Sequence, residues 1–223
     1  MSYTMVHIYI AENVAKQIKR ITDYPTYLLG AIAPDAVHAR DNYDPSQKEK
    51  SHLFTDGLRW GKIREDTQVG AWTDSIRKYY SAHKDGPDYD FHLGYAVHLF
   101  SDVYSSRYFY APLIKTMGGD IEKIKPQFLK ENFGYNYYLY LKYSKDHDLH
   151  AILNAGKPIT SEGGVTVEDI KKRVELLFKQ EFAERDISDI DSYTICPHEA
   201  MSAMMEASTE LVLKNLRELD KEL

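Results

Sequence analysis

Apolar residues in this chain recur mainly at intervals of three and four positions, the spacing that places them on one face of an α-helix. The first such stripe consists of Val6, Ile10, Val14, Ile18 and Ile21. It predicts a helix that ends before Pro25. The short apolar run over residues 27–33 is stopped by Pro34 and predicts a buried helical turn or short helix. Strands would require apolar residues at every second position, and the chain has no convincing run of that kind.

Beyond residue 35, polar segments separate further helical patterns. Residues 36–50 are rich in Asp, Asn, Lys and Pro and are predicted to form a loop. Asp66 or Thr67 is placed to cap a helix that extends to about Ala82, before a turn at residues 84–88. Further helices are predicted over residues 89–110, 120–132, 135–145, 167–185 and 198–219, with a glycine-containing surface loop over 154–165.

These patterns predict an all-α protein with a single domain, residues 1–223, built as a multi-helix bundle. A length of 223 residues fits one generous domain. Hydrophobic residues make up 43% and charged residues 28%, which excludes a disordered or fibrous chain. The candidate chemistry falls in the first half, about 1–110, and residues 111–223 form a helical remainder.

The charge balance and the cysteine count narrow the possible partners. There are 28 Lys and Arg against 34 Asp and Glu, a net charge of −6, so no stable complex with nucleic acid is expected. The single cysteine, Cys196, excludes an intrachain disulfide and fits a reducing compartment. Neither a secretory signal nor an apolar run long enough to span a membrane is present, so we expect a cytoplasmic location. The oligomeric state is not encoded in any pattern that we recognise.

The sharpest chemical signal lies in the most apolar helix, over residues 89–110. His98 and Asp102 are four residues apart and therefore share one helix face. A buried imidazole and carboxylate side by side are costly unless a divalent cation or a simple His–Asp hydrogen bond compensates them. His92 lies about 120° round the helix from His98 and reaches the same cavity only from its flank. The small residue Gly94 between them allows another backbone close to this helix.

Three further residues could join this pair. His7 lies in an apolar context on the first helix, Asp35 follows an apolar turn and a proline, and His52 lies where a polar segment becomes apolar. Each also has a simpler interpretation: a core hydrogen bond for His7, a helix cap for Asp35, and an ordinary loop histidine for His52. Together with His98 and Asp102 they supply nitrogen and oxygen donors that suit zinc or another first-row divalent metal.

The motifs and their order resemble those of the zinc-dependent phospholipase C family, which is related to the S1/P1 nucleases. The matching segments are His7, Gly-Ala-Ile-Ala-Pro-Asp at 30–35, Ser-His at 51–52 and Leu-Gly-Tyr-Ala-Val-His-Leu-Phe-Ser-Asp at 93–102. They cover roughly residues 5–110. The resemblance implies an all-helical bundle of the phospholipase C/P1 nuclease type, with clustered zinc ions that cleave phosphate esters.

The resemblance also implies roles for the individual residues. Asp35, His52 and His98 correspond to ligands of one metal, His7 to a ligand of a second, and Asp102 to the carboxylate that bridges them. A bridge requires a carboxylate because its two oxygens can hold two cations about 3.5–4 Å apart.

This sequence departs from the family in two respects. Secreted members use the processed N-terminal amino group as a ligand, and they hold a third metal with a later histidine and a His-x-x-x-Glu pair. Residues 103–109 contain no histidine. We therefore expect one or two zinc ions, with His92 as a possible substitute ligand or outer partner.

The implied reaction is hydrolysis of a small-molecule phosphoester by a metal-activated water. Asp35 is the candidate catalytic residue that orients this water or accepts its proton. Arg107, just beyond Asp102, is the second catalytic candidate, because it could steady a phosphate; the simpler interpretation is an ion-paired helix end. Lys48 and Arg40 could supply charge to the substrate or belong to a solvated loop.

Two alternatives remain open. A helical metal-dependent phosphohydrolase of the HD type would need an adjacent His-Asp pair, and the only one here, His147-Asp148, lies in a polar stretch. The second alternative is a catalytically inactive helical binding protein that holds one structural metal or none.

Overall fold

The computed structural model describes residues 3–54, 65–118, 121–221 and 223. Within these residues every regular element is helical and no strand occurs, which confirms the all-α prediction. The long helices are α1 (Thr4–Ala15), α2 (Tyr24–Ile32), α4 (Asp66–His83), α5 (Tyr89–Tyr104), α7 (Ile121–Tyr143), α9 (Val167–Leu176) and α10 (His198–Leu219). The shorter ones are η1 (Ala33–Ala39), α3 (Pro45–Ser51), η2 (Ser105–Tyr110), α6 (Ala111–Thr116), α8 (Leu149–Ala155), η3 (Leu177–Glu181) and η4 (Ile190–Ser192).

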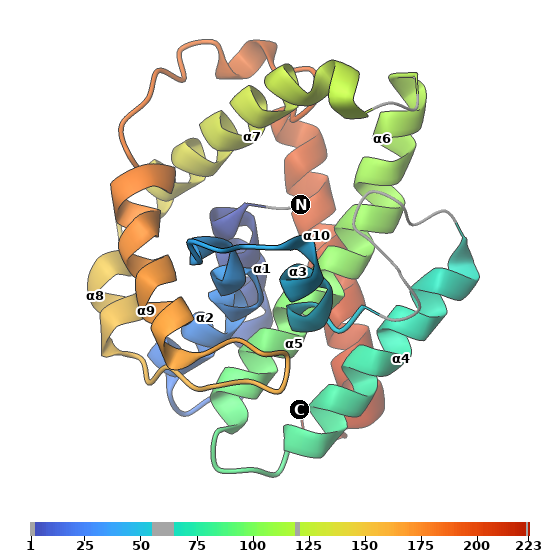
Figure 1. The fold of residues 1–223 in the computed structure, drawn as a ribbon, viewed down its shortest axis with the longest axis vertical. Helices are drawn as coiled ribbons and strands as arrows, with labels where there is room; N and C mark the ends of the chain where they lie inside the picture. Colours follow the sequence, from blue (N-terminus) through green and yellow to red (C-terminus); the bar gives the residue numbers. More distant parts are fainter. Residues whose placement is uncertain (1–2, 55–64, 119–120, 222) are drawn as a thin grey trace.

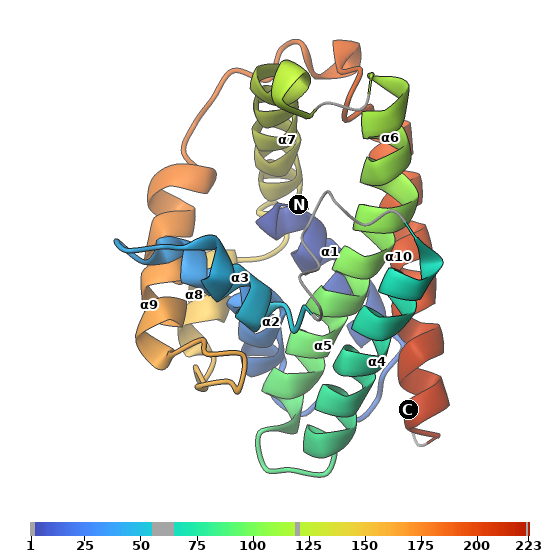
Figure 2. The ribbon, with the colours of Figure 1, turned by 45° about the vertical axis from the view of Figure 1, so that its right-hand side comes forward.

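Helix α5 is the central element of the bundle (Figures 1 and 2). It packs against α1 and α2 on one side and against α4 and α10 on the other. All of its residues from Tyr89 to Val103 are buried, as the apolar pattern predicts. A helix that is buried all round has no solvated face, so any polar side chain on it must find a partner inside the protein.

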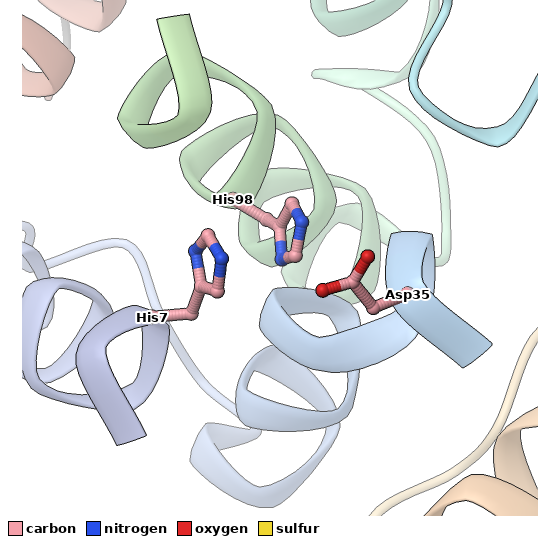
Figure 3. Close-up of side chains that lie close together, drawn as sticks. All are labelled: His7, Asp35 and His98. Atoms are coloured by element: carbon pink, nitrogen blue, oxygen red, sulfur yellow. The ribbon is translucent and has the colours of Figure 1, made fainter. Parts of the chain in front are cut away.

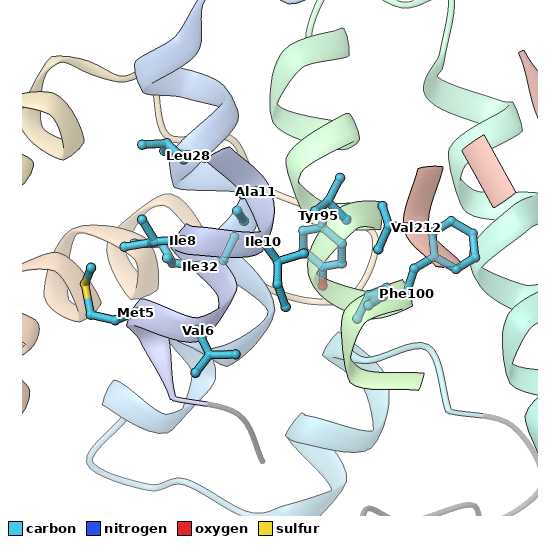
Figure 4. Packing of buried hydrophobic residues seen from close by; sticks show 14 of the residues in the cluster. Met5, Val6, Ile8, Ile10, Ala11, Leu28, Ile32, Tyr95, Phe100 and Val212 are labelled. Atoms are coloured by element: carbon cyan, nitrogen blue, oxygen red, sulfur yellow. The ribbon is translucent and has the colours of Figure 1, made fainter. Parts of the chain in front are cut away.

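The hydrophobic core joins the two halves of the chain around α5. In Figure 4, side chains of α1, α2, α5 and α10 pack together; those labelled are Met5, Val6, Ile8, Ile10, Ala11, Leu28, Ile32, Tyr95, Phe100 and Val212. Met5, Ile8 and Ile10 have no exposed surface. No helix in the described residues is long and apolar enough to cross a lipid bilayer.

Two glycines let α2 and α5 cross with their backbones in contact. A Cβ added to Gly30 would lie 2.0 Å from the carbonyl oxygen of Phe91, and one added to Gly94 would lie 2.0 Å from that of Tyr27. The prediction that a small residue at position 94 admits a neighbouring backbone is confirmed. This crossing brings the end of α2 directly beside the middle of α5.

The helix boundaries differ from the predicted ones in two places, whereas the helix predicted over 89–110 is present over its whole length. The first helix ends at Ala15, although Ile18 beyond it is still buried. Residues 121–143 form one helix instead of two, and Gly134 lies inside it, where a Cβ would lie 2.0 Å from the hydroxyl oxygen of Tyr193. The helix predicted over 89–110 continues past Tyr104 with a π-helical turn.

The predicted loop over residues 36–50 is wrong, because it contains the end of η1 and most of α3. Asp44 caps α3 by accepting a hydrogen bond from the backbone N–H of Ser46, and Pro45 occupies the first helical position. An aspartate followed by proline is a helix-start signal. The high polarity of the segment conceals this signal.

Candidate metal centre

Five predicted ligands meet in the interior although they come from four segments of the chain. His7 lies on α1, Asp35 on η1, His52 directly after α3, and His98 and Asp102 on α5. None of the five is more than 6% exposed. Figure 3 shows three of them, His7, His98 and Asp35, pointing toward a common space from three elements.

The nitrogen and oxygen atoms that could bind a metal are as close together as atoms that share a metal ion. Nε2 of His52 lies 3.4 Å from Oδ1 of Asp35 and 3.4 Å from Oδ2 of Asp102. Oδ2 of Asp102 is 3.8 Å from Nε2 of His98, and Oδ1 is 3.6 Å from Nε2 of His7. Ligands that share a tetrahedral zinc ion at bond lengths of about 2.0–2.2 Å lie about 3.3–3.6 Å apart. In two groups of three residues, one ligand atom of each residue lies within 4.8 Å of those of the other two. These groups are His7, Asp35 and His98, and His52, His98 and Asp102.

The groups divide the ligands differently from the family pattern. That pattern places His52 with Asp35 and His98, whereas the structure groups His7 with those two residues. His98 belongs to both groups. The two carboxylate oxygens of Asp102 face different histidines, Oδ1 toward His7 and Oδ2 toward His52 and His98. A carboxylate in this orientation can bridge two cations.

The end of α2 fixes the orientation of His98. Pro34 follows α2 closely, and the carbonyl groups of a helix's last turn have no partner within the helix. One of them, the carbonyl of Ala31, accepts a hydrogen bond from Nδ1 of His98 at 2.8 Å. The glycine-mediated crossing of α2 and α5 makes this contact possible. With its proton on Nδ1, the neutral ring presents a lone pair on Nε2.

Two serines fix His7 and His52 in the same way. Ser101 donates its only hydroxyl proton to the carbonyl of His98 at 2.7 Å, so its oxygen accepts from Nδ1 of His7 at 2.9 Å. Ser51 donates to the carbonyl of Lys48 at 3.2 Å and accepts from Nδ1 of His52 at 3.0 Å. All three imidazoles therefore bond through Nδ1 and point Nε2 at the cluster. Metal-binding histidines have this arrangement.

The backbone around His52 is held tightly. The indole N–H of Trp72 donates to the carbonyl of His52 at 2.7 Å, and the hydroxyl of Tyr95 donates to the carbonyl of Ser51 at 2.5 Å. Leu53, the next residue, has φ +53°, a left-handed conformation that costs a non-glycine residue about 1–2 kcal/mol. The buried anchors from α4 and α5 offset this strain and keep His52 in place.

The cluster lacks hydrogen-bond donors. Within the described residues, the buried atoms without a hydrogen-bond partner include Nε2 of His7, His52 and His98 and both carboxylate oxygens of Asp102. All five atoms are acceptors, so they cannot satisfy one another. An unsatisfied buried polar atom costs about 1–3 kcal/mol. Divalent cations between these atoms would satisfy them, and the residues therefore fit a metal.

The protonation states suit metal binding. The pKa of His7 is lowered, mainly by burial. The nearby carboxylates of Asp102 and Asp35 act in the opposite direction but do not outweigh burial. Burial, together with His7, lowers the pKa of His98 well below its ordinary value. Both rings are consequently neutral at neutral pH, the form that coordinates metals.

Both carboxyl groups remain ionised. Burial by itself raises the pKa of Asp35, but the ammonium of Lys48 and the ring of His38 outweigh this effect. The net result is a pKa well below the ordinary value of a carboxyl group. Burial likewise raises the pKa of Asp102, and the neighbouring His52, His7 and His98 outweigh it, so the net shift is downward.

Two residues near the cluster were not predicted as partners of its ligands. Lys48, for which substrate charge and a solvated loop were both open, is buried on α3, and its Nζ lies 2.9 Å from Oδ1 of Asp35. Nδ1 of His38 lies 3.4 Å from the same oxygen. The spacing contained a signal for both, because His38 is three residues after Asp35 and Lys48 is four residues before His52.

The other predicted site residues lie in different surroundings. His92 belongs to neither metal-site group; its Nδ1 is 2.6 Å from the hydroxyl of Tyr79, and its ring stacks on His83. Arg107 forms an ion pair with Asp66 at 2.9 Å, which matches its simpler interpretation. Arg40, another residue of the predicted loop, is paired with Asp169 at 2.5 Å.

A pocket of about 370 Å³ lies next to the cluster. His38 links the two, since it lines the pocket and contacts Asp35. Comparisons of this chain with protein-family models, with curated proteins and with solved structures find no match. The case for a function therefore depends on the residues themselves.

Proposed function

We propose that this protein is a divalent-metal-dependent hydrolase that cleaves phosphoesters, with zinc as the preferred metal. The observation that carries the proposal is the convergence of five buried acceptor atoms, three imidazole nitrogens and two carboxylate oxygens, without a donor among them in the described residues. The ligands would be His7, Asp35, His52, His98 and Asp102. A mixed nitrogen and oxygen donor set of this kind suits zinc.

The orientation of Asp102 favours two ions over one. Its Oδ1 faces His7 and its Oδ2 faces His52 and His98. Two carboxylates and one lysine, Lys48, give the cluster a net charge of −1 when the histidines are neutral, which favours cations. The order of the ligands along the chain supports membership of the zinc-dependent phospholipase C and P1 nuclease group.

Bound divalent ions polarise a phosphoryl oxygen and lower the pKa of water toward neutrality. The chain's own residues would position the reactants. The ionised carboxylate of Asp35 can orient the attacking water by accepting a hydrogen bond from it, and Lys48 holds the carboxylate in a fixed position. The burial of the whole cluster excludes bulk water and strengthens each electrostatic contact. We propose a small-molecule phosphoester as the substrate.

Metal analysis of the purified protein, followed by a hydrolysis assay, tests the proposal. We expect two equivalents of metal and hydrolysis of bis(p-nitrophenyl) phosphate or p-nitrophenyl phosphate after loading with Zn²⁺ or Mn²⁺. Asp102→Asn should lower the rate by more than about 100-fold, since loss of even an outer partner of a ligand costs about 10–100-fold.

Asp90→Asn is the matched control. Asp90 is a buried carboxylate on the same helix, and it accepts hydrogen bonds from the backbone N–H groups of Thr22 and Asp23. This variant should keep its metal and its activity. Protein that binds metal but hydrolyses neither substrate would instead support an inactive binding protein with a structural metal. Protein that binds none would remove the basis of the proposal.

A further inference from the structure

The pocket beside the metal cluster carries positive charge. It is lined among others by His38, Phe133, Arg173, Leu176, Glu181 and Arg185, and we call it the arginine pocket. Its walls come from η1, α7, α9 and η3, and Figure 1 shows α7 and α9 on the same side of the bundle. The two arginines belong to the helical remainder of the chain, whereas His38 belongs to the half that carries the metal ligands.

One of the two arginines is neutralised within the pocket. Arg173 forms an ion pair with Glu181 at 2.6 Å, and Thr4 donates a hydrogen bond to the same carboxylate at 2.8 Å. Arg173 also donates to Thr4 at 2.7 Å. These three side chains form a closed polar network whose charges cancel.

Arg185 keeps its positive charge uncompensated. Within the described residues it donates hydrogen bonds to the backbone carbonyls of Gln180, Glu181 and Ala183, and no carboxylate pairs with it. Its guanidinium also lies over the ring of Phe133, 5.1 Å from the centroid. The guanidinium is thus held in one orientation before any ligand arrives.

These features specify an anionic ligand. The three carbonyls take the Nε and Nη2 hydrogens of Arg185, so its Nη1 group is the donor left for a phosphate, and a donor that is already oriented loses little entropy on binding. His38 lines the pocket, and its Nδ1 lies 3.4 Å from Oδ1 of Asp35, one of the proposed metal ligands. A ligand in the pocket therefore lies next to a phosphoester held at the cluster.

We propose that the arginine pocket binds a second phosphate group of the substrate, with Arg185 as its main contact. This proposal rests on the proposed function, because it identifies the substrate class of the same site: a soluble phosphoester that carries another phosphate. The second phosphate is not part of the bond that is cleaved. Arg185 therefore affects binding of the substrate and not the hydrolysis step.

Binding of inorganic phosphate to the protein as purified tests the pocket without any need for hydrolysis. Titration followed by calorimetry or ³¹P NMR should show binding that Arg185→Gln weakens about tenfold or more, as expected for loss of a hydrogen bond to a charged group. Arg217→Gln, an exposed arginine on α10 that bonds to Gln17, is the matched control and should bind phosphate like the wild type. Equal affinities of the wild type and Arg185→Gln would overturn the proposal.

A second variant changes binding in the opposite direction. Glu181→Gln removes the carboxylate that neutralises Arg173 and should tighten phosphate binding severalfold. A purely structural role of these residues predicts weaker binding in both variants. The Glu181 variant therefore decides the question even if Arg185→Gln fails to fold, and unchanged or weaker binding in it would contradict the proposal.

A matched pair of substrates separates the pocket from the reaction. The p-nitrophenyl ester of thymidine 5′-phosphate and its 3′-phosphorylated counterpart differ by a single phosphate. We expect a lower KM for the second substrate, an advantage lost in Arg185→Gln while kcat stays unchanged; equal KM values would overturn the assignment. Absence of hydrolysis with both, together with phosphate binding that depends on Arg185, would refute the proposed function and leave the anion pocket standing.

Discussion

Helix α5 carries two histidines that each stack on a histidine of another helix, and the two pairs are nearly identical in geometry. The rings of His98 and His7 are 3.7 Å apart at an angle of 12°, and those of His92 and His83 are 3.8 Å apart at 11°. Two parallel imidazoles in contact are therefore not sufficient to mark a metal centre. The difference lies in what surrounds each pair.

The pair of His7 and His98 faces a buried carboxylate, Asp102, and its Nε2 atoms have no donor partner among the described residues. In the pair of His83 and His92, Nδ1 of His92 lies 2.6 Å from the hydroxyl of Tyr79, and Nε2 of His83 lies 3.4 Å from the carboxylate of Glu162, which is 74% exposed. A hydroxyl can both donate and accept, so it satisfies an imidazole without a cation. Nε2 of His83 also lacks a hydrogen-bond partner, so the comparison indicates that several unsatisfied acceptors around a buried carboxylate, rather than clustered histidines, identify the site.

Replacing one histidine of each pair tests the comparison with the largest expected effect. His98→Gln should weaken metal binding by more than about 100-fold, because even outer partners of ligands contribute about 10–100-fold. His92→Gln should leave metal affinity unchanged. Competition against a fluorescent chelator measures both. Equal losses in the two variants would show that both pairs bind metal.

The partners of the rings give a smaller and more specific test. Ser101→Ala removes the acceptor of Nδ1 of His7 and should lower metal affinity by about 10–100-fold without removing a ligand. Tyr79→Phe removes the partner of His92 and should lower the free energy of unfolding by about 1 kcal/mol, with metal affinity unaffected. Metal binding at full strength in Ser101→Ala would contradict the orientation that we assign to His7.

The smallest effect concerns acid stability. Burial, with a contribution from His83, lowers the pKa of His92 to about 4 from an ordinary value of 6.5. The unfolded chain therefore takes up a proton near pH 6.5 and the folded chain near pH 4. This residue's contribution to stability is lost as the pH falls from 6.5 to 4. Urea unfolding over this range should show a shallower loss in His92→Gln than in the wild type; parallel curves would refute the assigned shift.

The five candidate ligands could be named from the sequence because their motifs follow the order found in a known family, although His7, Asp35 and His52 each also had a simpler interpretation. His98 and Asp102 share a helix face, and Asp35 follows a proline-terminated turn. His92 lies about 120° round the helix from His98, and this angle turns His92 away from the metal cluster and toward Tyr79 on α4.

The partners of the donors could not be predicted in the same way. Lys48 reaches Asp35 only because the polar segment before His52 folds as a seven-residue helix, and such short helices depend on tertiary contacts more than on propensity. Arg185 is 147 residues from His38 along the chain, and no periodic pattern reports a pairing at that distance.

The crossing at Gly30 and Gly94 has a consequence for how the centre can vary. Main chains in direct contact cannot slide past each other by a fraction of a residue, since each glycine sits against a carbonyl oxygen of the opposite helix. The register that places His98 over the Ala31 carbonyl therefore cannot change in small steps. A substitution at this crossing either preserves the register or disrupts it completely. Rigid interlocking of this kind leaves side-chain substitution, rather than helix displacement, as the route by which related sequences could adjust their affinity for a metal.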